Sequence, residues 1–201
     1  MTADKVGRLL NVSRETLCQF EAYLALLEKW QRRINLVADS TMANVWQRHI
    51  LDSAQLVKFY PPNTKKVLDV GSGAGFPGLV LAIMGNVEVD LVESDHRKAV
   101  FLSTVVRSLG LPAKIHNQRI ETLPNLAPDV ITARALAPVS ILMKLIENQI
   151  SLDTVCLFLK GASVEDELTE LQTYSTIVSL KHPSLSSANG VVLELKNKSL
   201  I

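Results

Sequence analysis

The chain has 201 residues, of which 47% are hydrophobic and 20% are charged, and its formal net charge is +1. The length suits one domain with a small extension, and the composition allows a buried core and excludes a disordered chain. Because the net charge is close to zero, binding to a nucleic acid has to rest on a local patch or on a preassembled particle. The chain has no basic start followed by an apolar segment and no run approaching 18 apolar residues, so we expect a soluble, cytoplasmic protein that does not bind a membrane.

The two cysteines, Cys18 and Cys156, lie far apart in apolar surroundings, without a CxxC pattern or neighbouring histidines. Free cysteines in such surroundings are usually small buried hydrophobic residues. We therefore expect both to be buried and structural, and we expect neither a disulfide nor a metal site.

Residues 1–60 predict a helical segment. One helix of this segment ends near Trp30 and carries an apolar stripe with three- and four-residue spacing. The stripe consists of Leu17, Phe20, Leu24 and Leu27. A helix-start signal follows at residues 39–41. The stripe of the next helix consists of Trp46, Ile50, Ser53 and Val57, and Pro61 ends that helix. Because no Gly/Ser-rich linker follows, we expect residues 1–60 to form an extension packed on a domain that spans residues 61–201.

From Lys65 onward, apolar strands alternate with helical stretches. The candidate strands are 66–70, 87–92, 113–116, 129–133, 154–159, 176–180 and 191–195. The candidate helices are 77–84, 96–109, 138–149 and 163–173. This alternation predicts an α/β fold with a mostly parallel, seven-stranded sheet and helices on both faces. The last two strands lack a helix between them, so they predict a hairpin that adds an antiparallel strand.

The stretch from Val67 to Gly78 predicts a buried strand that leads into a tight turn, with a helix beginning near Pro77. Glycines occupy positions 71, 73, 75 and 78 of this stretch. They allow the backbone to approach a ligand closely, so the turn predicts a site for a nucleotide-like cofactor.

Two kinds of cofactor motif compete for this turn. The dinucleotide fingerprint Gly-x-Gly-x-x-Gly fails when counted from Gly71, because its third glycine falls on Phe76, although a shifted match that begins at Gly73 survives. Asp69, followed by glycines at 71, 73 and 75, is more similar to the first motif of Rossmann-like S-adenosylmethionine-dependent methyltransferases. In those enzymes the turn encloses the amino-acid end of the cofactor.

Glu93 ends the second apolar strand, roughly 20 residues after Gly71, which is the spacing at which an acidic side chain meets a ribose. A carboxylate is suitable there because two neighbouring hydroxyls can both donate to it. The alternative is a solvated acid at the end of a strand. Asp95, two residues on, also suits capping of the helix at 96–109.

Arg134 follows the strand at 129–133, at the carboxyl edge of the sheet, where ligands bind in open α/β folds. Its guanidinium can hold a cofactor carboxylate or an RNA phosphate. The alternative is a surface salt bridge.

Two further groups of polar residues are candidates. In methyltransferases the loop after the third strand, here residues 117–121, commonly closes over the adenine, although Arg119 and Glu121 can also form an ordinary solvated pair. His49 and Asp52 lie three residues apart on one helical face. They either serve a ligand site or hydrogen-bond to each other beside the core.

The chain shows no evident catalytic dyad. It lacks the Asn/Asp-Pro-Pro-aromatic element that follows the fourth strand in enzymes that methylate exocyclic amino groups, and neither cysteine follows a proline or threonine, as in enzymes that attack pyrimidine C6. Methylation of a ring nitrogen with a free lone pair, such as guanine N7, needs neither a base nor a covalent nucleophile. It needs in-line alignment, exclusion of water and electrostatic support, so the absence of a dyad agrees with this chemistry.

Several short segments together resemble the RsmG/GidB family, bacterial methyltransferases that act on N7 of a guanine in small-subunit ribosomal RNA. They are Asn35-Leu36, Arg48-His49-Ile50-Leu51-Asp52-Ser53, the stretch from Asp69 to Gly78, Arg119-Ile120-Glu121, Arg134-Ala135 and Leu159-Lys160-Gly161. The resemblance spans nearly the whole chain. It implies a Rossmann-like enzyme that transfers a methyl group from S-adenosylmethionine to 16S ribosomal RNA, within a small ribosomal subunit or an assembly intermediate. We expect it to act as a monomer and without a metal ion.

The resemblance also implies roles for individual residues. The residues that it places at S-adenosylmethionine are Gly71, Phe76, Ile120, Glu121 and Arg134. The general methyltransferase pattern adds Gly73, Gly75 and Glu93 to this cofactor site. The residues that line the entry of the RNA base, as candidates for positioning it, are Arg119, Arg134, His49 and Asp52.

The chain departs from the family pattern at two places. Glu93 stands where many relatives carry Asp, which keeps the carboxylate and lengthens its reach. Residues 187–190 stand where a basic pair is expected, so the resemblance does not extend to a carboxy-terminal RNA contact. Two other functions stay open: a nicotinamide-dependent oxidoreductase that uses the shifted glycine match, and a non-enzymatic RNA-binding factor that retains a cofactor pocket.

Overall fold

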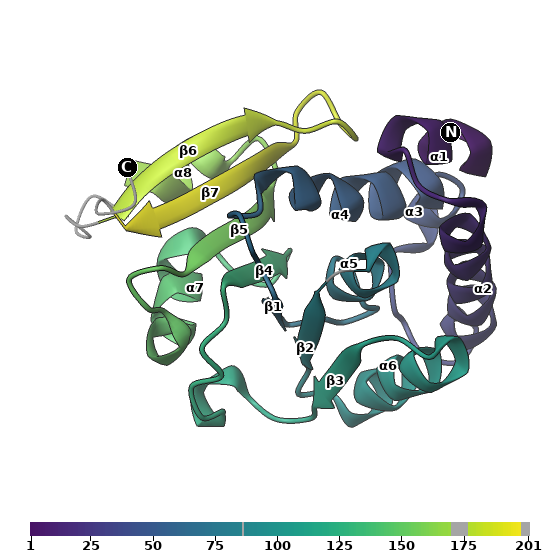
Figure 1. Ribbon diagram of the computed structural model, residues 1–201, viewed down its shortest axis with the longest axis horizontal. Coiled ribbons are helices and arrows are strands. Elements are labelled where there is room, and N and C mark those ends of the chain that lie inside the picture. The colour runs from purple at the N-terminus through teal and green to yellow at the C-terminus, as the bar shows by residue number, and fades with distance from the viewer. Residues whose placement is uncertain (86, 170–176, 198–201) are drawn as a thin grey trace.

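The computed structural model describes residues 1–85, 87–169 and 177–197 and shows an α/β fold built around one sheet (Figure 1). Within these residues, seven strands lie in the order β3-β2-β1-β4-β5-β7-β6. Their bounds are β1 Lys66–Val70, β2 Glu88–Val92, β3 Ala113–His116, β4 Val130–Arg134, β5 Val155–Lys160, β6 Ile177–Pro183 and β7 Val191–Asn197. The predicted α/β class and the seven predicted strands are confirmed, apart from residue 176, which lies outside the described residues.

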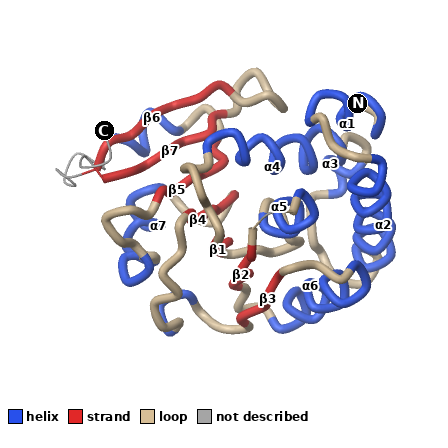
Figure 2. The backbone as a smooth tube through the Cα atoms, viewed as in Figure 1, coloured by secondary structure: helices blue, strands red, loops and turns tan. Residues whose placement is uncertain are grey.

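Strands β1 to β5 pair in parallel, whereas β7 runs antiparallel to both β5 and β6. Figure 2 shows the β6–β7 hairpin beyond β5, at one edge of the sheet. Residues 184–190 join its two strands, and this connection is too short for a parallel crossover. The predicted antiparallel hairpin is therefore confirmed.

Helices cover both faces of the sheet. The α-helices are α1 Ala3–Leu10, α2 Arg14–Gln31, α3 Asp39–Met42, α4 Asp52–Ala54, α5 Gly78–Met84, α6 His96–Leu109, α7 Val139–Leu145 and α8 Val164–Thr169. The other helical turns are η1 Trp46–Leu51, η2 Gln55–Phe59, η3 Ile120–Thr122 and η4 Glu147–Gln149. Successive strand residues point to opposite faces, so Val67 packs with α2, α5 and α6, whereas Leu68 packs with α7 and α8.

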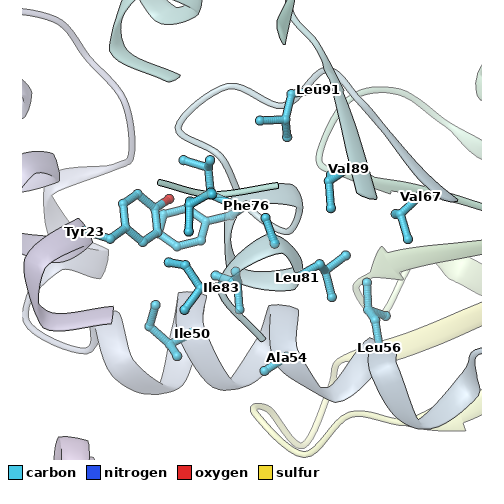
Figure 3. Packing of buried hydrophobic residues seen from close by; sticks show 14 of the residues in the cluster. Tyr23, Ile50, Ala54, Leu56, Val67, Phe76, Leu81, Ile83, Val89 and Leu91 are labelled. Atoms are coloured by element: carbon cyan, nitrogen blue, oxygen red, sulfur yellow. The ribbon is translucent and has the colours of Figure 1, made fainter. Parts of the chain in front are cut away.

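The first 60 residues pack on the same face of the sheet as α5 and α6. Their buried side chains join those of β1, β2 and α5 in one continuous cluster (Figure 3). The rings of Tyr23 and Phe76 lie 5.2 Å apart between centroids, with Ile50 and Ile83 near them. The Tyr23 hydroxyl donates a 2.6 Å hydrogen bond to the carbonyl of Ala74 in the glycine turn. The helical segment therefore supports this turn directly.

The helix predicted after residue 45 is irregular. It begins as the π-helical turn η1, continues as α4 and ends as the 3₁₀ helix η2. Ile50 and Ser53 are buried as predicted, but Val57 is 36% exposed, so its predicted place in the stripe is wrong. A π turn and a 3₁₀ turn both depart from 3.6 residues per turn, and the predicted spacing therefore loses its register before Val57.

Two further predictions are corrected. Cys156 is buried in β5, but Cys18 is exposed on α2, because it lies outside the stripe to which Phe20 and Leu27 belong. Residues 138–149 do not form one helix, since α7 ends at Leu145 and the turn η4 follows. Of the helix predicted at 163–173, the structure describes α8, which ends at Thr169, and residues 170–173 lie outside the described residues.

Within the part of the chain that the structure describes, no helix is both long and apolar enough to cross a bilayer.

Candidate active site

Two adjoining cavities lie at the carboxyl edge of the sheet. The glycine-turn chamber, of about 350 Å³, is bordered by the turn after β1, the end of β2 and the loop after β3. The hairpin chamber, of about 880 Å³, is bordered by residues 36–41, η1, the ends of β4 and β5 and the hairpin loop 184–190. Both chambers are lined by Leu36, Arg134, Ala135 and Leu136. The two chambers are therefore adjacent, and we call these four residues their shared wall.

The glycine turn is held by the neighbouring strand, because two of its backbone N–H groups donate to the carbonyl of Val92. Gly73 lines the chamber with a φ of +55°, and a Cβ built there meets nothing closer than 3.7 Å, so its backbone faces open space. Gly75 is not among the lining residues. A Cβ at Gly75 would lie 2.3 Å from Cδ1 of Leu79, so this glycine is required for the packing of α5.

Asp69 lies fully buried beneath the turn. Thr132 Oγ1 donates to its Oδ1 at 2.8 Å, and Ser72 Oγ donates to its backbone carbonyl at 3.0 Å. Burial raises the pKa of the Asp69 carboxyl to about 6, because the lost hydration outweighs these hydrogen bonds. Asp69 lines neither chamber, so it acts on the site by shaping the turn.

Glu93 directly follows β2, lines the glycine-turn chamber and is only 8% exposed, so it is not a solvated acid. Its Oε2 accepts from the backbone N–H of Gly73 at 2.8 Å, and its Oε1 accepts from that of Asp95 at 2.7 Å. A carboxylate has about four acceptor positions, so positions are left for two hydroxyl donors. The Asp95 side chain caps α6 by accepting from the backbone N–H groups of Arg97 and Lys98, as predicted.

The loop after β3 forms another wall of the glycine-turn chamber. Ile120 is buried and begins η3, whereas Arg119 and Glu121 are exposed, and all three line the chamber. No ion pair joins Arg119 to Glu121, both of which are described residues. The structure brings seven of the predicted cofactor-binding residues together in this chamber. They are Gly71, Gly73, Phe76, Glu93, Ile120, Glu121 and Arg134.

Arg134, at the end of β4, has a side chain that is 18% exposed. Its Nη1 donates to the carbonyl of Arg48 at 3.2 Å and lies 3.7 Å from Oδ2 of Asp52. Its Cζ lies 5.0 Å from the centroid of the Phe76 ring. This ion pair and the cation–π contact hold the guanidinium inside the site, so Arg134 is not part of a surface salt bridge.

Apolar residues complete the shared wall. Ala135 has a left-handed backbone conformation with a φ of +52°, which is uncommon for a residue with a Cβ. Leu136, the next residue, lies over Gly71, where a built Cβ would come within 2.7 Å of its Cδ1. The Gln31 side chain fixes Leu36, because its Oε1 accepts the N–H of Leu36 at 3.0 Å and the following N–H at 3.1 Å. Leu136 and Gln31 carry no motif signal in the sequence.

His49 is 6% exposed, and its ring stacks on Phe76 with centroids 4.7 Å apart. Its Nε2 lies 2.8 Å from Oγ1 of Thr41, and that hydroxyl donates its one hydrogen to the carbonyl of Ala38. Nε2 of His49 therefore carries a proton and donates to Thr41. Burial and the positive charges of two neighbouring arginines lower the pKa of His49 to about 3, so the ring is neutral and its Nδ1 cannot donate.

Asp52 connects the shared wall to the hairpin loop, and it does not hydrogen-bond to the nearby imidazole. Its Oδ1 accepts from Ser186 Oγ at 2.5 Å and from Gln55 Nε2 at 3.1 Å. Gln55 also accepts the backbone N–H of Leu185 at 2.8 Å, and Gln47 donates to the carbonyl of Ser186 at 2.8 Å. The contacts to Leu185 and Ser186 span at least 130 positions of sequence and tie the loop to η1, α4 and η2.

Within the described residues, the hairpin chamber is lined by three cationic side chains, those of Arg48, Arg134 and Lys160. Lys160 Nζ donates to the carbonyl of Ala137 and to Oε2 of Glu167, both at 2.7 Å. The Arg48 guanidinium has no hydrogen-bond or ion-pair partner in residues 1–85, 87–169 and 177–197. Arg48 and Lys160 belong to the segments that carry the family resemblance, but no pattern in the sequence gave either a role.

Comparisons with known proteins agree with this architecture. A family model described as rRNA small subunit methyltransferase G matches residues 16–196. The protein "Ribosomal RNA small subunit methyltransferase G" of Rhodospirillum rubrum is 47% identical over 195 residues, which cover 97% of each chain. The protein of the same name from Paramagnetospirillum magneticum is 47% identical over 188 residues, which cover 94% of this chain and 92% of that one.

Solved structures share the fold at low sequence identity. A SAM dependent methyltransferase from Aquifex aeolicus is 16% identical with a TM-score of 0.58, over 73% of this chain and 90% of that chain. A variant of MtNAS in complex with S-adenosylmethionine is 17% identical with a TM-score of 0.59, over 98% of this chain and 84% of that chain. The predicted Rossmann-like methyltransferase fold is confirmed.

The relatives support the predicted methyltransferase and give no support to the nicotinamide-dependent alternative. The family, together with the S-adenosylmethionine in a solved structure of the same fold, supports S-adenosylmethionine as the cofactor. The family model and the relatives cover the glycine-turn chamber and the hairpin chamber alike. The chain belongs to the rRNA small subunit methyltransferase G family, which is the family that its sequence resembles.

Proposed function

We propose that the protein transfers a methyl group from S-adenosylmethionine to N7 of a guanine in 16S ribosomal RNA. The observation that carries this proposal is the shared wall of the two chambers. The glycine-turn chamber has the groups that a nucleoside cofactor needs, and the hairpin chamber is wide enough for a base that has left its stack. The methyl group would cross at Leu36, Arg134, Ala135 and Leu136.

The residues of the glycine-turn chamber fit S-adenosylmethionine. Glu93 is buried, is held by two backbone N–H groups and retains acceptor positions for the two ribose hydroxyls. Gly73 leaves open space for close approach, and Ile120 offers an apolar surface to the adenine. The proposed cofactor-binding residues are Gly71, Gly73, Gly75, Phe76, Glu93, Ile120, Glu121 and Arg134, with Gly75 acting through the packing of the turn.

When bound, S-adenosylmethionine supplies an electrophilic methyl group on its sulfonium. The residues of the chain have to align N7 with that methyl group and exclude water, because N7 offers a lone pair and gives up no proton. Arg119 and Arg134 hold the cofactor and the RNA. His49 is neutral, so it adds no charge beside a purine that becomes cationic, and Asp52 offsets the charge of Arg134 at the same place.

We further propose that the substrate is a small ribosomal subunit or an assembly intermediate, and that protein-free RNA is a poorer substrate. A net charge of +1 gives the chain little general attraction for RNA, so a preformed surface has to supply the binding. The enzyme acts as a monomer in the cytoplasm, and residues 61–201 form its methyltransferase domain with residues 1–60 as the extension. Equal turnover on protein-free RNA and on small subunits would contradict this substrate.

The test is transfer of labelled methyl from S-adenosylmethionine to small subunits from a strain that lacks its own enzyme, followed by digestion to nucleosides. We expect the label in 7-methylguanosine. Label in another nucleoside would overturn the N7 assignment and keep the cofactor. Tight cofactor binding without any transfer would favour the RNA-binding factor.

A further inference from the structure

We propose that Arg48 selects guanine, by donating a hydrogen bond to O6 of the base while N7 faces the shared wall. This inference rests on the proposed function, because it assumes that a guanine occupies the hairpin chamber. It assigns to Arg48 the discrimination between guanine and adenine, which both offer a nucleophilic N7.

The chemistry of the two purines requires such a group close to N7. Guanine presents O6 and N7 as two acceptors on one edge, whereas adenine presents an amino donor in place of O6. A side chain that can only donate therefore accepts guanine and leaves an adenine with two opposed donors. A site built to pair with one polar group rejects analogues that lack it far more strongly than an apolar pocket does.

Most polar side chains of the hairpin chamber are already engaged by other groups of the protein. The proton of His49 is on Nε2 and is used by Thr41, so its Nδ1 only accepts. Arg134 is engaged by Asp52 and by the carbonyl of Arg48. Lys160 already donates to a carboxylate and a carbonyl.

The neutral polar residues of the chamber do not discriminate either. Ser186 uses its hydroxyl on Asp52. Ser187 and Asn189 line the chamber, but a hydroxyl and a carboxamide both donate and accept, so each can pair with O6 of guanine or with N6 of adenine. Within the described residues, Arg48 is thus the one donor-only side chain of the chamber that has no partner.

Arg48 also lies at the right place. Its carbonyl is 3.2 Å from Nη1 of Arg134, so its backbone adjoins the shared wall where N7 has to point. Arg48 lines the hairpin chamber, and its positive charge acts on both His49 and Arg134. The residue belongs to the π-helical turn η1, and such turns are frequent at functional sites. The hairpin chamber therefore has an unpaired donor on a residue whose backbone adjoins the shared wall.

The contribution of Arg48 is to selection and alignment. A hydrogen bond to O6 withdraws electron density from the ring, so it does not make N7 a better nucleophile. We therefore expect Arg48→Met to raise KM for the RNA more than it lowers kcat. Arg48→Lys keeps the charge but loses the planar fork, and it should restore activity only in part.

The experiment combines a change in the enzyme with a change in the base. Small subunits are reconstituted with 16S RNA in which the guanosine that the native enzyme methylates is replaced by 2-aminopurine, which lacks O6 and keeps N7. The native enzyme should lose about 10- to 100-fold in kcat/KM on this substrate. Arg48→Met, which has no donor group, should lose a similar factor on the natural substrate and no further factor on 2-aminopurine.

Arg107→Met is the matched control, because Arg107 is an exposed arginine of α6 that lines neither chamber. The inference is overturned if replacing guanine by 2-aminopurine lowers kcat/KM of Arg48→Met by the same factor as kcat/KM of the native enzyme. If the Arg48 variant has a kcat/KM lower than that of the native enzyme by the same factor on both substrates, and its RNA binding depends less steeply on salt, Arg48 is a phosphate contact instead. Failure of the native enzyme to form 7-methylguanosine would refute the proposed function, which is a separate result.

Discussion

The two chambers are built in different ways. The glycine-turn chamber is lined mainly by three turns that each follow directly on a parallel strand: residues 70–76, 92–98 and 118–121. The hairpin chamber is lined by four segments that are far apart in the chain: residues 36–52, 134–138, 159–167 and 186–190. The first chamber therefore depends on local turn geometry, and the second depends on long-range contacts.

The forces that hold the two chambers differ accordingly. In the glycine-turn chamber, backbone N–H groups hold the carboxylate of Glu93, and the neighbouring strand holds the turn. In the hairpin chamber, Asp52 of α4 and Gln55 of η2 hold the loop. Substitutions can therefore damage one chamber and leave the other intact.

The largest effect is expected at the wall that both chambers share. Arg134→Ala removes a guanidinium that lines both cavities and leaves the carboxylate of Asp52 without its cation. We expect about a 10²- to 10³-fold loss of kcat/KM, with weaker cofactor binding and weaker RNA binding. Methyl transfer and calorimetric titration measure these effects, with Arg107→Ala as the control. A folded Arg134→Ala enzyme with full activity would refute the role of the shared wall.

The next effect concerns the titration of one buried group in each region, Asp69 below the glycine turn and His49 beside the hairpin chamber. The Asp69 pKa of about 6 in the folded protein lies above its ordinary value of 3.8, so this group lowers the free energy of unfolding as the pH rises from about 4 to 6. The His49 pKa of about 3 lies below 6.5, so this group lowers the free energy of unfolding as the pH falls from about 6.5 to 3. Between pH 4 and 6 the two contributions oppose each other.

Single variants should separate these contributions. As the pH falls from 6.5 to 4, the free energy of unfolding of His49→Gln should rise relative to that of the native protein. As the pH falls from 6 to 4, the free energy of unfolding of Asp69→Asn should fall relative to that of the native protein. Each difference should change by up to about 3 kcal/mol. Urea unfolding at a series of pH values measures both trends. Parallel pH profiles for the two variants would contradict this assignment of the buried groups.

A smaller effect is expected for a change confined to the glycine-turn chamber. Glu93→Gln removes the charge and half of the acceptor capacity of a group that meets Gly73 and the proposed ribose. The affinity for S-adenosylmethionine should fall about 10- to 100-fold, while binding of the small subunit in the absence of cofactor stays unchanged. Glu88→Gln, an exposed change on the same strand, is the control. An unaltered cofactor affinity would remove Glu93 from the site.

The smallest effect is expected for a change confined to the hairpin chamber. Gln55→Leu leaves the backbone N–H of Leu185 without its acceptor and removes one donor from Asp52. The free energy of unfolding should fall by about 1–2 kcal/mol, and KM for the RNA should rise while the cofactor affinity stays constant. Chemical denaturation and steady-state kinetics measure this. A loss of cofactor affinity equal to that of Glu93→Gln would show that the chambers are not separable.

The same contrast explains which parts of the site the sequence could predict. The turn, the strand ends and the acidic residue at the end of β2 follow each other along the chain, so spacing alone placed Gly73 and Glu93 together. Gly75 shows the limit of this reasoning, because the pattern could not distinguish a glycine that faces the cavity from one that packs on Leu79. Val57 shows another limit, since a π turn changes the register of a helix without a sequence signal.

The sequence by itself determined the alternation of strands and helices, the antiparallel hairpin and the family to which the chain belongs, because these depend on the order of residues and on short spacings. Only the tertiary structure decided that Tyr23 supports the glycine turn, that Gln31 fixes Leu36 and that Asp52 ties the hairpin loop to the wall. It also decided that Arg48, rather than Lys160, keeps its donors unpaired in the hairpin chamber. The physical reason is that such partners are chosen by the packing of distant segments, and the residue types at either end do not specify which pairs will meet.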